Sequence, residues 1–222
     1  MFTKEALLSC STAPNINSIS LELYKEFSEE YLIPNIFHYD FLDGDSIDIE
    51  FTEWGIYHML SIQHIDRRVK KKRFFSEIEK GLSFDTFRKD RKKNQRFKKE
   101  KKRITMFACV YYVLLNGTIF YLPNKRVRNT AEVEMDYIVY QKLENISPHG
   151  ITYNGINVGI RKCEEVYVPL TILVSPNSNV EEYITDEQLK IVKSVYVTNR
   201  YGTVIEEKHY NATLKISPVP VL

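Results

Sequence analysis

The chain lacks most features that mark a secreted, membrane-bound or metal-dependent protein. It has three cysteines, Cys10, Cys109 and Cys163, and they form no CxxC pair, so neither a zinc site nor a disulfide scaffold is indicated. A reducing cytoplasm fits this cysteine usage best. No secretory signal opens the sequence. The apolar run Ile104–Leu115 is shorter than the roughly 20 residues of a membrane-spanning helix. We therefore expect a cytoplasmic protein with no membrane partner.

Motifs for nucleotide and metal chemistry are also missing. The sequence contains no Walker loop, GxGxxG, HExxH or GxSxG pattern, and its carboxylates lack the spacing of metal ligands. Asp43 and Asp45 flank Gly44, a pattern that favours a tight turn over a metal site. We therefore expect no cofactor and no bound metal.

Positive charge is concentrated in one stretch of the chain. The window from Arg67 to Arg103 holds 18 of the 31 Lys and Arg residues but 5 of the 29 Asp and Glu residues, a net charge of +13. The rest of the chain then carries −11, which the overall net charge of +2 conceals. Such asymmetry indicates a polyanionic partner, and RNA or another nucleic acid is the leading candidate because cations release counterions from phosphates.

The order of periodic patterns favours the α+β class. Helical spacing in residues 18–32, around 53–62 and through the basic window comes first, with a β-hairpin over Asn35–Phe51. Residues 118–174 then read as four strands, followed by a short helix at Asp186–Val192 and a second hairpin over 194–209. We expect N-terminal helices and a hairpin packed on a four-stranded antiparallel sheet. We assign residues 1–17 to a tail, 18–192 to the main domain, and 193–222 to a C-terminal hairpin and tail.

His58 and His64 lie just before the basic window. A histidine titrates near physiological pH, so beside phosphate-binding cations it suits metal-independent RNA cleavage. One group takes the proton of the ribose 2′-OH, another protonates the leaving 5′ oxygen, and a cation neutralises the phosphorane. A structural role for either histidine remains the alternative.

The order of several short segments resembles the phage-associated branch of the barnase–EndoU–colicin–RelE-like (BECR) nucleases. The stretch 51–64, FTEWGIYHMLSIQH, is similar to the family's histidine-containing helix, and 75–83, FSEIEKGLS, to its next helix end. Arg103-Ile104, Asp136–Ile138 and Pro169–Thr171 match the later segments in the same order. The resemblance covers roughly residues 19 to 192 and implies a BECR-like fold.

The resemblance also implies roles for individual residues. His58 would act as acid or base, Arg103 would bind phosphate, and Tyr137 and Thr171 would face the scissile phosphate. The implied activity is that of a metal-independent endoribonuclease, a toxin or phage-related effector that leaves a 2′,3′-cyclic phosphate. The expected nucleic-acid-binding residues are His64, Lys71, Lys72, Arg88, Lys92, Arg96 and Lys99.

Three positions depart from the family pattern. Ile56 replaces a phenylalanine, Ser61 a glycine and His64 a lysine. These changes leave two interpretations open: an active site with altered chemistry, or a degenerate BECR fold that binds nucleic acid or phage components without cleaving. A third interpretation treats the lysine-rich helices as a docking surface for an acidic protein, such as an antitoxin.

Overall fold

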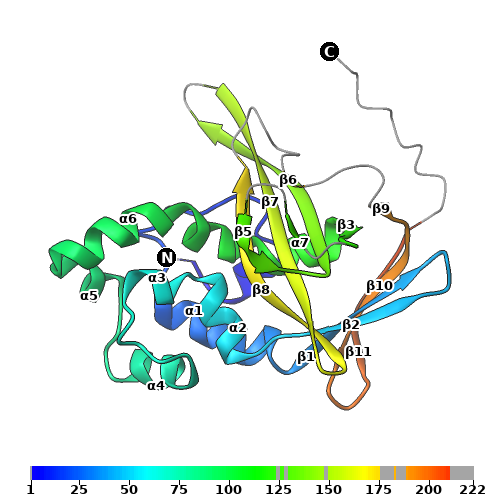
Figure 1. Ribbon diagram of the computed structural model, residues 1–222, viewed down its shortest axis with the longest axis horizontal. Helices are drawn as coiled ribbons and strands as arrows, with labels where there is room; N and C mark the ends of the chain where they lie inside the picture. Colours follow the sequence, from blue (N-terminus) through cyan, green and yellow to red (C-terminus); the bar gives the residue numbers. More distant parts are fainter. Residues whose placement is uncertain are drawn as a thin grey trace.

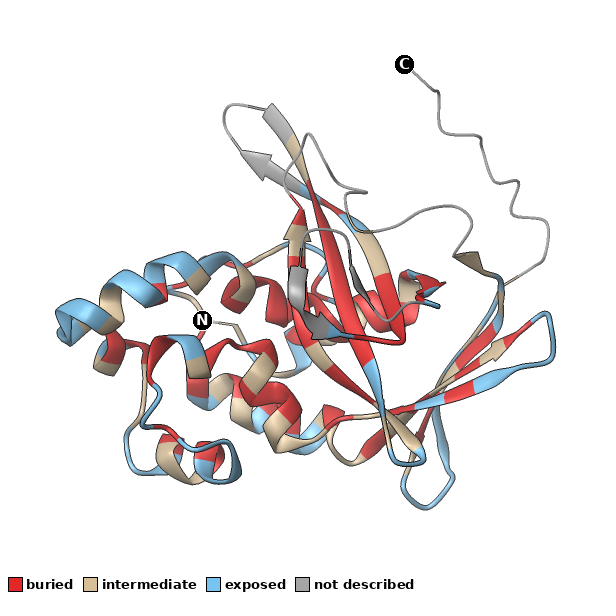
Figure 2. Ribbon diagram, viewed as in Figure 1, coloured by how far each residue is buried: buried red, intermediate tan, exposed pale blue. Residues whose placement is uncertain are grey.

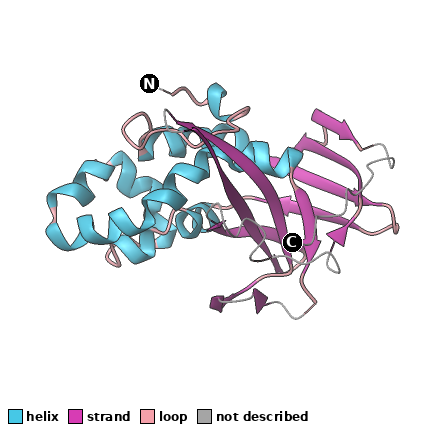
Figure 3. Ribbon diagram, turned by 90° about the horizontal axis from the view of Figure 1, so that it is seen from above, coloured by secondary structure: helices cyan, strands magenta, loops and turns pink. Residues whose placement is uncertain are grey.

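The computed structural model of the protein describes residues 2–123, 126–127, 130–147, 150–175, 183 and 189–210. Helices occupy most of the first half of the chain and strands most of the second, so the class is α+β. Seen from above, the helices lie together on one side of a curled sheet (Figure 3). The described part of the chain contains no helix that is both long and apolar enough to cross a lipid bilayer.

Side-chain caps begin several of the helices. Ser20, Thr52, Ser83 and Asp90 each accept a hydrogen bond from a backbone N–H in the first turn that follows. The α-helices are α1 (Leu21–Phe27), α2 (Glu53–Met59), α3 (Ile62–Ile65), α4 (Phe74–Glu79), α5 (Phe84–Lys89), α6 (Arg91–Met106) and α7 (Val110–Asn116). Shorter helical segments are η1 (Glu5–Leu7), η2 (Ser28–Leu32, a π-helix), η3 (Lys71–Arg73) and η4 (Phe107–Cys109).

The basic residues and the apolar run that follows them form one nearly continuous helical rod. Helix α6 passes through η4 into α7 without a proline or glycine between them (Figure 1). Phe97 and Ile104 are buried, whereas most cations of α6 are exposed, so its outer end is coloured as exposed in Figure 2. The C-terminal half of this rod is therefore buried in the core and anchors the exposed cations of α6.

The main sheet contains nine strands in the order β11-β10-β1-β2-β8-β7-β6-β3-β9. Neighbouring strands pair antiparallel, except that β2 and β8 pair parallel through Ile49 and Tyr167. The strands are β1 (Asn35–Phe41), β2 (Ser46–Glu50), β3 (Thr118–Tyr121), β6 (Tyr137–Ser147), β7 (Gly150–Cys163), β8 (Val166–Ser175), β9 (Leu189–Lys190), β10 (Val192–Asn199) and β11 (Val204–His209). A separate pair joins β4 (Arg126–Val127) to β5 (Thr130–Glu134).

The expected four-stranded antiparallel sheet is wrong. Strands β3, β6, β7 and β8 do arise from the expected segments, but the two hairpins join the same sheet and make it mixed and nine-stranded. The physical reason is that a hairpin leaves unpaired backbone groups along its outer edges. Here β1 pairs with β10, and β2 pairs with β8, so those edges are used to extend the sheet. Figure 1 shows the sheet bending between its two parts.

Residues at both ends of the described chain pack on the same core. Leu7 and Val197 are fully buried in the cluster that includes Tyr24, whose hydroxyl donates to the Ile104 carbonyl at 2.8 Å. The segments assigned from sequence to a tail and a C-terminal hairpin therefore contribute to the main hydrophobic core.

The expected helix over Asp186–Val192 is wrong where the structure describes it, from residue 189 on, and residues 186–188 lie outside the described residues. Within it, Leu189–Lys190 is the strand β9, which pairs with Ile119 and Phe120 of β3. The Lys190 ammonium also bonds both Asp43 and Asp45, at 2.6 and 3.0 Å, so the acidic turn is occupied by an ion pair within the fold.

Candidate active-site cleft

A cleft of about 280 Å³ lies among helices α2, α3 and α6 and strands β7 and β8. This volume is just below the range of about 300–1,000 Å³ that is typical of small-molecule sites. The cleft is lined by Trp54, His58, Gln63, His64, Arg103, Arg161, Leu170 and Thr171. Segments more than a hundred residues apart therefore meet here, and among these described lining residues none is Asp or Glu. The arrangement favours an anionic ligand.

Helix α2 is held close to strand β8 by a glycine. A Cβ atom at Gly55 would lie 2.8 Å from the Pro169 carbonyl oxygen, so no larger residue fits without a shift of the backbone. The Thr52 side chain caps the helix by accepting from the Gly55 N–H at 3.1 Å. This close approach turns Trp54 and His58, one helical turn apart, toward the cleft beside Thr171.

A strained residue between α2 and α3 holds Arg103 in place. Ser61 has φ 57° and ψ 26°, a left-handed conformation that favours glycine, and it is fully buried. Arg103 Nη1 donates a 2.5 Å hydrogen bond to Ser61 Oγ and lies 3.8 Å from Glu100. Burial lowers the pKa of Arg103, opposed by Glu100, but an arginine still remains charged. Ser61 thus adopts a backbone conformation typical of glycine and also supplies a hydroxyl group to Arg103.

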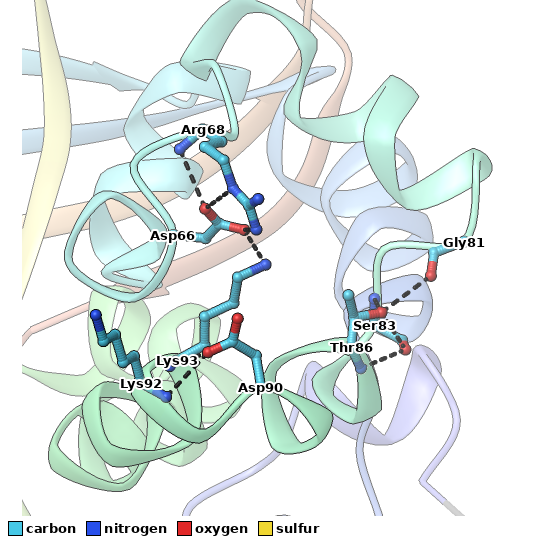
Figure 4. A network of polar contacts seen from close by, with 8 residues as sticks. All are labelled: Asp66, Arg68, Gly81, Ser83, Thr86, Asp90, Lys92 and Lys93. Carbon is cyan, nitrogen blue, oxygen red and sulfur yellow. Dashed lines mark hydrogen bonds and ion pairs between the residues drawn. The ribbon is translucent and has the colours of Figure 1, made fainter.

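A polar network fixes α3 against α6, as Figure 4 shows. Asp66, at the end of α3, accepts from Lys93 Nζ of α6 at 2.5 Å and from Arg68 at 3.1 and 3.2 Å. Burial opposes ionisation of Asp66, but the bonds from Lys93 and Arg68 hold its pKa below the ordinary value. Asp90 caps α6 through the backbone N–H groups of Lys92 and Lys93. The network therefore positions the two helices that carry His64 and Arg103.

The His58 ring is poised in its neutral form. Burial first, and then the positive charges of Lys71 and His64, lower the pKa of His58 below its ordinary value of 6.5. Its ring nitrogens bond to none of the described residues, and its ring makes a T-shaped contact with Trp54 at a centroid distance of 5.9 Å. A neutral, unpaired imidazole beside cations can accept a proton at neutral pH.

Thr171 faces the cleft, whereas Tyr137 does not. Thr171 pairs with Gly159 of β7, where an added Cβ would lie 2.6 Å from the threonine methyl group. Tyr137 pairs with the next β7 residue, Ile160, and therefore faces the opposite side of the sheet. It packs among Phe41, Tyr121 and Tyr167, and burial raises its pKa to about 12. The structure brings His58, His64, Arg103 and Thr171 together and places Tyr137 in the core.

Apart from His64, the expected nucleic-acid-binding residues do not line the cleft, and they differ in their interactions. Lys92, Arg96 and Lys99 are exposed on α6 and, within the described chain, none forms an ion pair. Together with Arg103 they follow one helical face, because their spacings of 3 and 4 residues match the helical repeat. Lys71 and Lys72 are exposed in η3. Arg88 instead bonds Asp85 at 2.9 Å and Asn17 at 3.0 Å.

Sequence reasoning missed several residues of the cleft. Trp54 lies four residues before His58, a spacing that places both on one helical face, so this signal was available. Gln63 and Leu170 carry no comparable pattern. Arg161 comes from strand β7, far from the basic window, and pairs with Glu134 at 3.7 Å. Only the tertiary structure brings Arg161 into the lining of the cleft.

Comparisons with known proteins add no relative to this description. Searches against protein-family models, curated proteins and solved structures gave no match. Among the residues that the structure describes, no group of three or more His, Cys, Asp or Glu side chains is arranged to hold a metal ion. The similarity to BECR nucleases therefore stays a prediction from short segments.

Proposed function

We propose that the protein is a metal-independent endoribonuclease that leaves a 2′,3′-cyclic phosphate. The observation that carries this proposal is the cleft itself, in which two histidines, an arginine and a threonine meet from distant segments. Metal-independent RNA cleavage needs a base, an acid and groups that stabilise the phosphorane. The segment order that resembles BECR nucleases supports the same activity, including a role as a toxin or phage-related effector.

In this mechanism His58 is the general base. Its lowered pKa leaves the ring neutral at pH 7, so it accepts the proton of the ribose 2′-OH. The 2′ oxygen attacks the adjacent phosphorus, and the bond to the 5′ oxygen breaks. His64, exposed at the mouth of the cleft, donates a proton to that leaving oxygen. Two histidines with opposite roles thus complete the proton transfer.

Arg103 and Thr171 stabilise the charge that develops on the phosphate. The Arg103 guanidinium is held by Ser61 and is partly buried, so it needs little rearrangement and its charge is poorly screened. The Thr171 hydroxyl has no hydrogen-bond partner among the described residues and can donate to a phosphate oxygen. Lys92, Arg96 and Lys99, with Lys71 and Lys72, would hold the flanking phosphates.

The direct test is cleavage of end-labelled RNA in EDTA, with the product end identified by mass. We expect a cyclic phosphate, and no cleavage where a single 2′-deoxynucleotide replaces the attacking ribose. Arg103→Gln should reduce the rate about 100-fold or more. Arg88→Gln is the matched control, because Arg88 is already bonded to Asp85 and Asn17. This variant should cleave RNA at the normal rate. Loss of activity in both variants, or a product without the cyclic phosphate, would contradict the proposal.

A second candidate is a nucleic-acid-binding protein that does not cleave. The exposed, unpaired cations of α6 favour it, because they suit a phosphate backbone independently of the cleft. Binding that weakens steeply with salt, without any cleavage product, would select this candidate. The same surface would suit an acidic protein partner, and competition between that partner and RNA would reveal it.

A further inference from the structure

Trp54 and Gln63 line the cleft but have no part in the proton transfers. The Trp54 indole is partly exposed, and Lys71 Nζ lies 5.7 Å from its ring centroid. An exposed indole beside cations is the kind of surface on which nucleic-acid bases stack. Trp54 also lies one helical turn from His58, so a base stacked there belongs to a nucleotide at the scissile phosphate.

Gln63 carries an unsatisfied polar atom at the same place. Its Oε1 is buried and has no hydrogen-bond partner among the described residues. A buried acceptor without a donor is unfavourable, and a ligand that supplies a donor relieves this cost. Rotation about the last side-chain bond, which is a soft torsion, turns the amide toward the cleft that Gln63 lines.

From these two residues we propose a base-recognition subsite that selects adenine in single-stranded RNA. The base stacks on Trp54, its exocyclic amine donates to Gln63 Oε1, and a ring nitrogen accepts from Gln63 Nε2. The inference rests on the proposed function, because it places the base next to the phosphate that His58 and Arg103 act on. A base that stacks on the indole must leave the stack of a duplex, so the subsite takes a single strand.

Two physical arguments favour adenine over the pyrimidines. Uracil presents a carbonyl oxygen where adenine presents its amine, so the amide must turn over to pair with uracil, whose single ring also offers the indole less area than a purine. Cytosine has an amine, but its single ring offers less area for stacking on the indole than a purine does. The amide of Gln63 and the area of Trp54 therefore act together.

Trp54 supplies its own probe, because the chain contains one tryptophan. Short 2′-O-methyl homopolymers of A, C and U cannot be cleaved by 2′-OH attack, so titrations with them measure binding alone. We expect saturable quenching of Trp54 fluorescence, with about tenfold tighter binding of the A oligomer than of the U oligomer. Gln63→Met keeps the side-chain length without the amide and should retain quenching while losing most of this preference.

Gln141→Met is the matched control, because Gln141 bonds the Lys142 carbonyl outside the cleft, and it should keep the preference. Circular dichroism should show both variants folded. Equal affinity of the native protein for A and U oligomers, or cleavage of RNA without any quenching, would overturn the subsite. Quenching with a preference for A but no cleavage of 2′-hydroxyl RNA would instead overturn the nuclease and leave the subsite standing.

Discussion

Two histidines of the molecule, one on the sheet and one on a helix, occupy very different environments. His38, on β1, has both ring nitrogens bonded, Nδ1 to Asp48 at 2.7 Å and Nε2 to Thr198 at 2.8 Å, and its ring stacks on Tyr196. His58, on α2, bonds to none of the described residues through its ring nitrogens. The arrangement of His38, Asp48 and Thr198 resembles a catalytic triad. Its hydrogen bonds, however, fix the His38 ring as a bridge across three strands. A histidine whose ring nitrogens are both bonded within the fold cannot readily exchange a proton with a substrate. His58 has unbonded ring nitrogens, and this property distinguishes the candidate site.

The largest expected effect comes from removing each of these histidines in turn. His58→Ala should reduce RNA cleavage about 100- to 10,000-fold and change stability little, since it removes the base and no hydrogen bond. His38→Ala should leave cleavage unchanged but lower the free energy of unfolding by about 1 kcal/mol through its lost cross-strand bonds. Rate measurements and urea denaturation on both variants check the two effects. Comparable cleavage by the two variants would remove the distinction between the histidines.

The next effect concerns how helices α3 and α6 are held together beside the cleft. The cleft depends on the tertiary ion pair between Asp66 and Lys93, whose side chains are 8% and 13% exposed. Asp66→Asn should lower the free energy of unfolding by about 2–3 kcal/mol, because it leaves Lys93 without its counter-charge. Asp85→Asn, which breaks an exposed pair with Arg88, should change stability little. Thermal denaturation of the two variants measures this contrast, and equal midpoints would contradict it.

Local features of the fold could be predicted from the sequence, whereas contacts between distant segments could not. The hairpins at residues 35–51 and 194–209 follow from local alternation and turn residues, and they were found. Strand β1 pairs with β10 to join the two hairpins, and the pairing of Ile49 with Tyr167 joins them to the remaining strands; both are contacts between distant segments that no local pattern announces. The nine-stranded sheet was therefore missed.

The candidate site shows a similar division. Of the predicted catalytic residues, His58, Arg103 and Thr171 meet in the cleft. Which face each strand residue takes was beyond the sequence, since one step of register reverses it. The register of β7 and β8 shifts between Gly159 and Ile160, and Tyr137, opposite Ile160, faces the core. A tyrosine chosen by motif alone therefore lies on the wrong side of the sheet for this cleft.

A smaller effect should separate two residues that share a backbone strain. Ser61 and Glu164 are the described non-glycine residues with positive φ, 57° and 58°. Glu164→Gly should raise the free energy of unfolding by about 1 kcal/mol and leave cleavage unchanged, because it relieves strain alone. Ser61→Gly relieves the same strain but removes the hydroxyl that holds Arg103, so cleavage should fall several-fold. Equal cleavage by the two variants would show that Ser61 does not position Arg103.

The smallest effect lies in the pH profile of the cleft. The native protein should lose activity as the pH falls through the lowered pKa of His58, below 6.5, because protonation removes the base. Lys71→Gln removes one of the charges that lower this pKa, so the acidic limb should move to higher pH by less than about one unit, worth up to about 1.4 kcal/mol. Lys72→Gln removes an equal charge that is not among those acting on His58 and should leave the limb in place. Rates from pH 4 to 8, with an NMR titration of the His58 ring, test both variants.

Since the folded pKa of His58 lies below the unfolded one, protonation of His58 also makes the free energy of unfolding fall as the pH drops below 6.5. Rates must therefore be compared where denaturation curves show every variant still folded. An unmoved limb in Lys71→Gln would mean that His58 is not the group whose protonation stops the reaction.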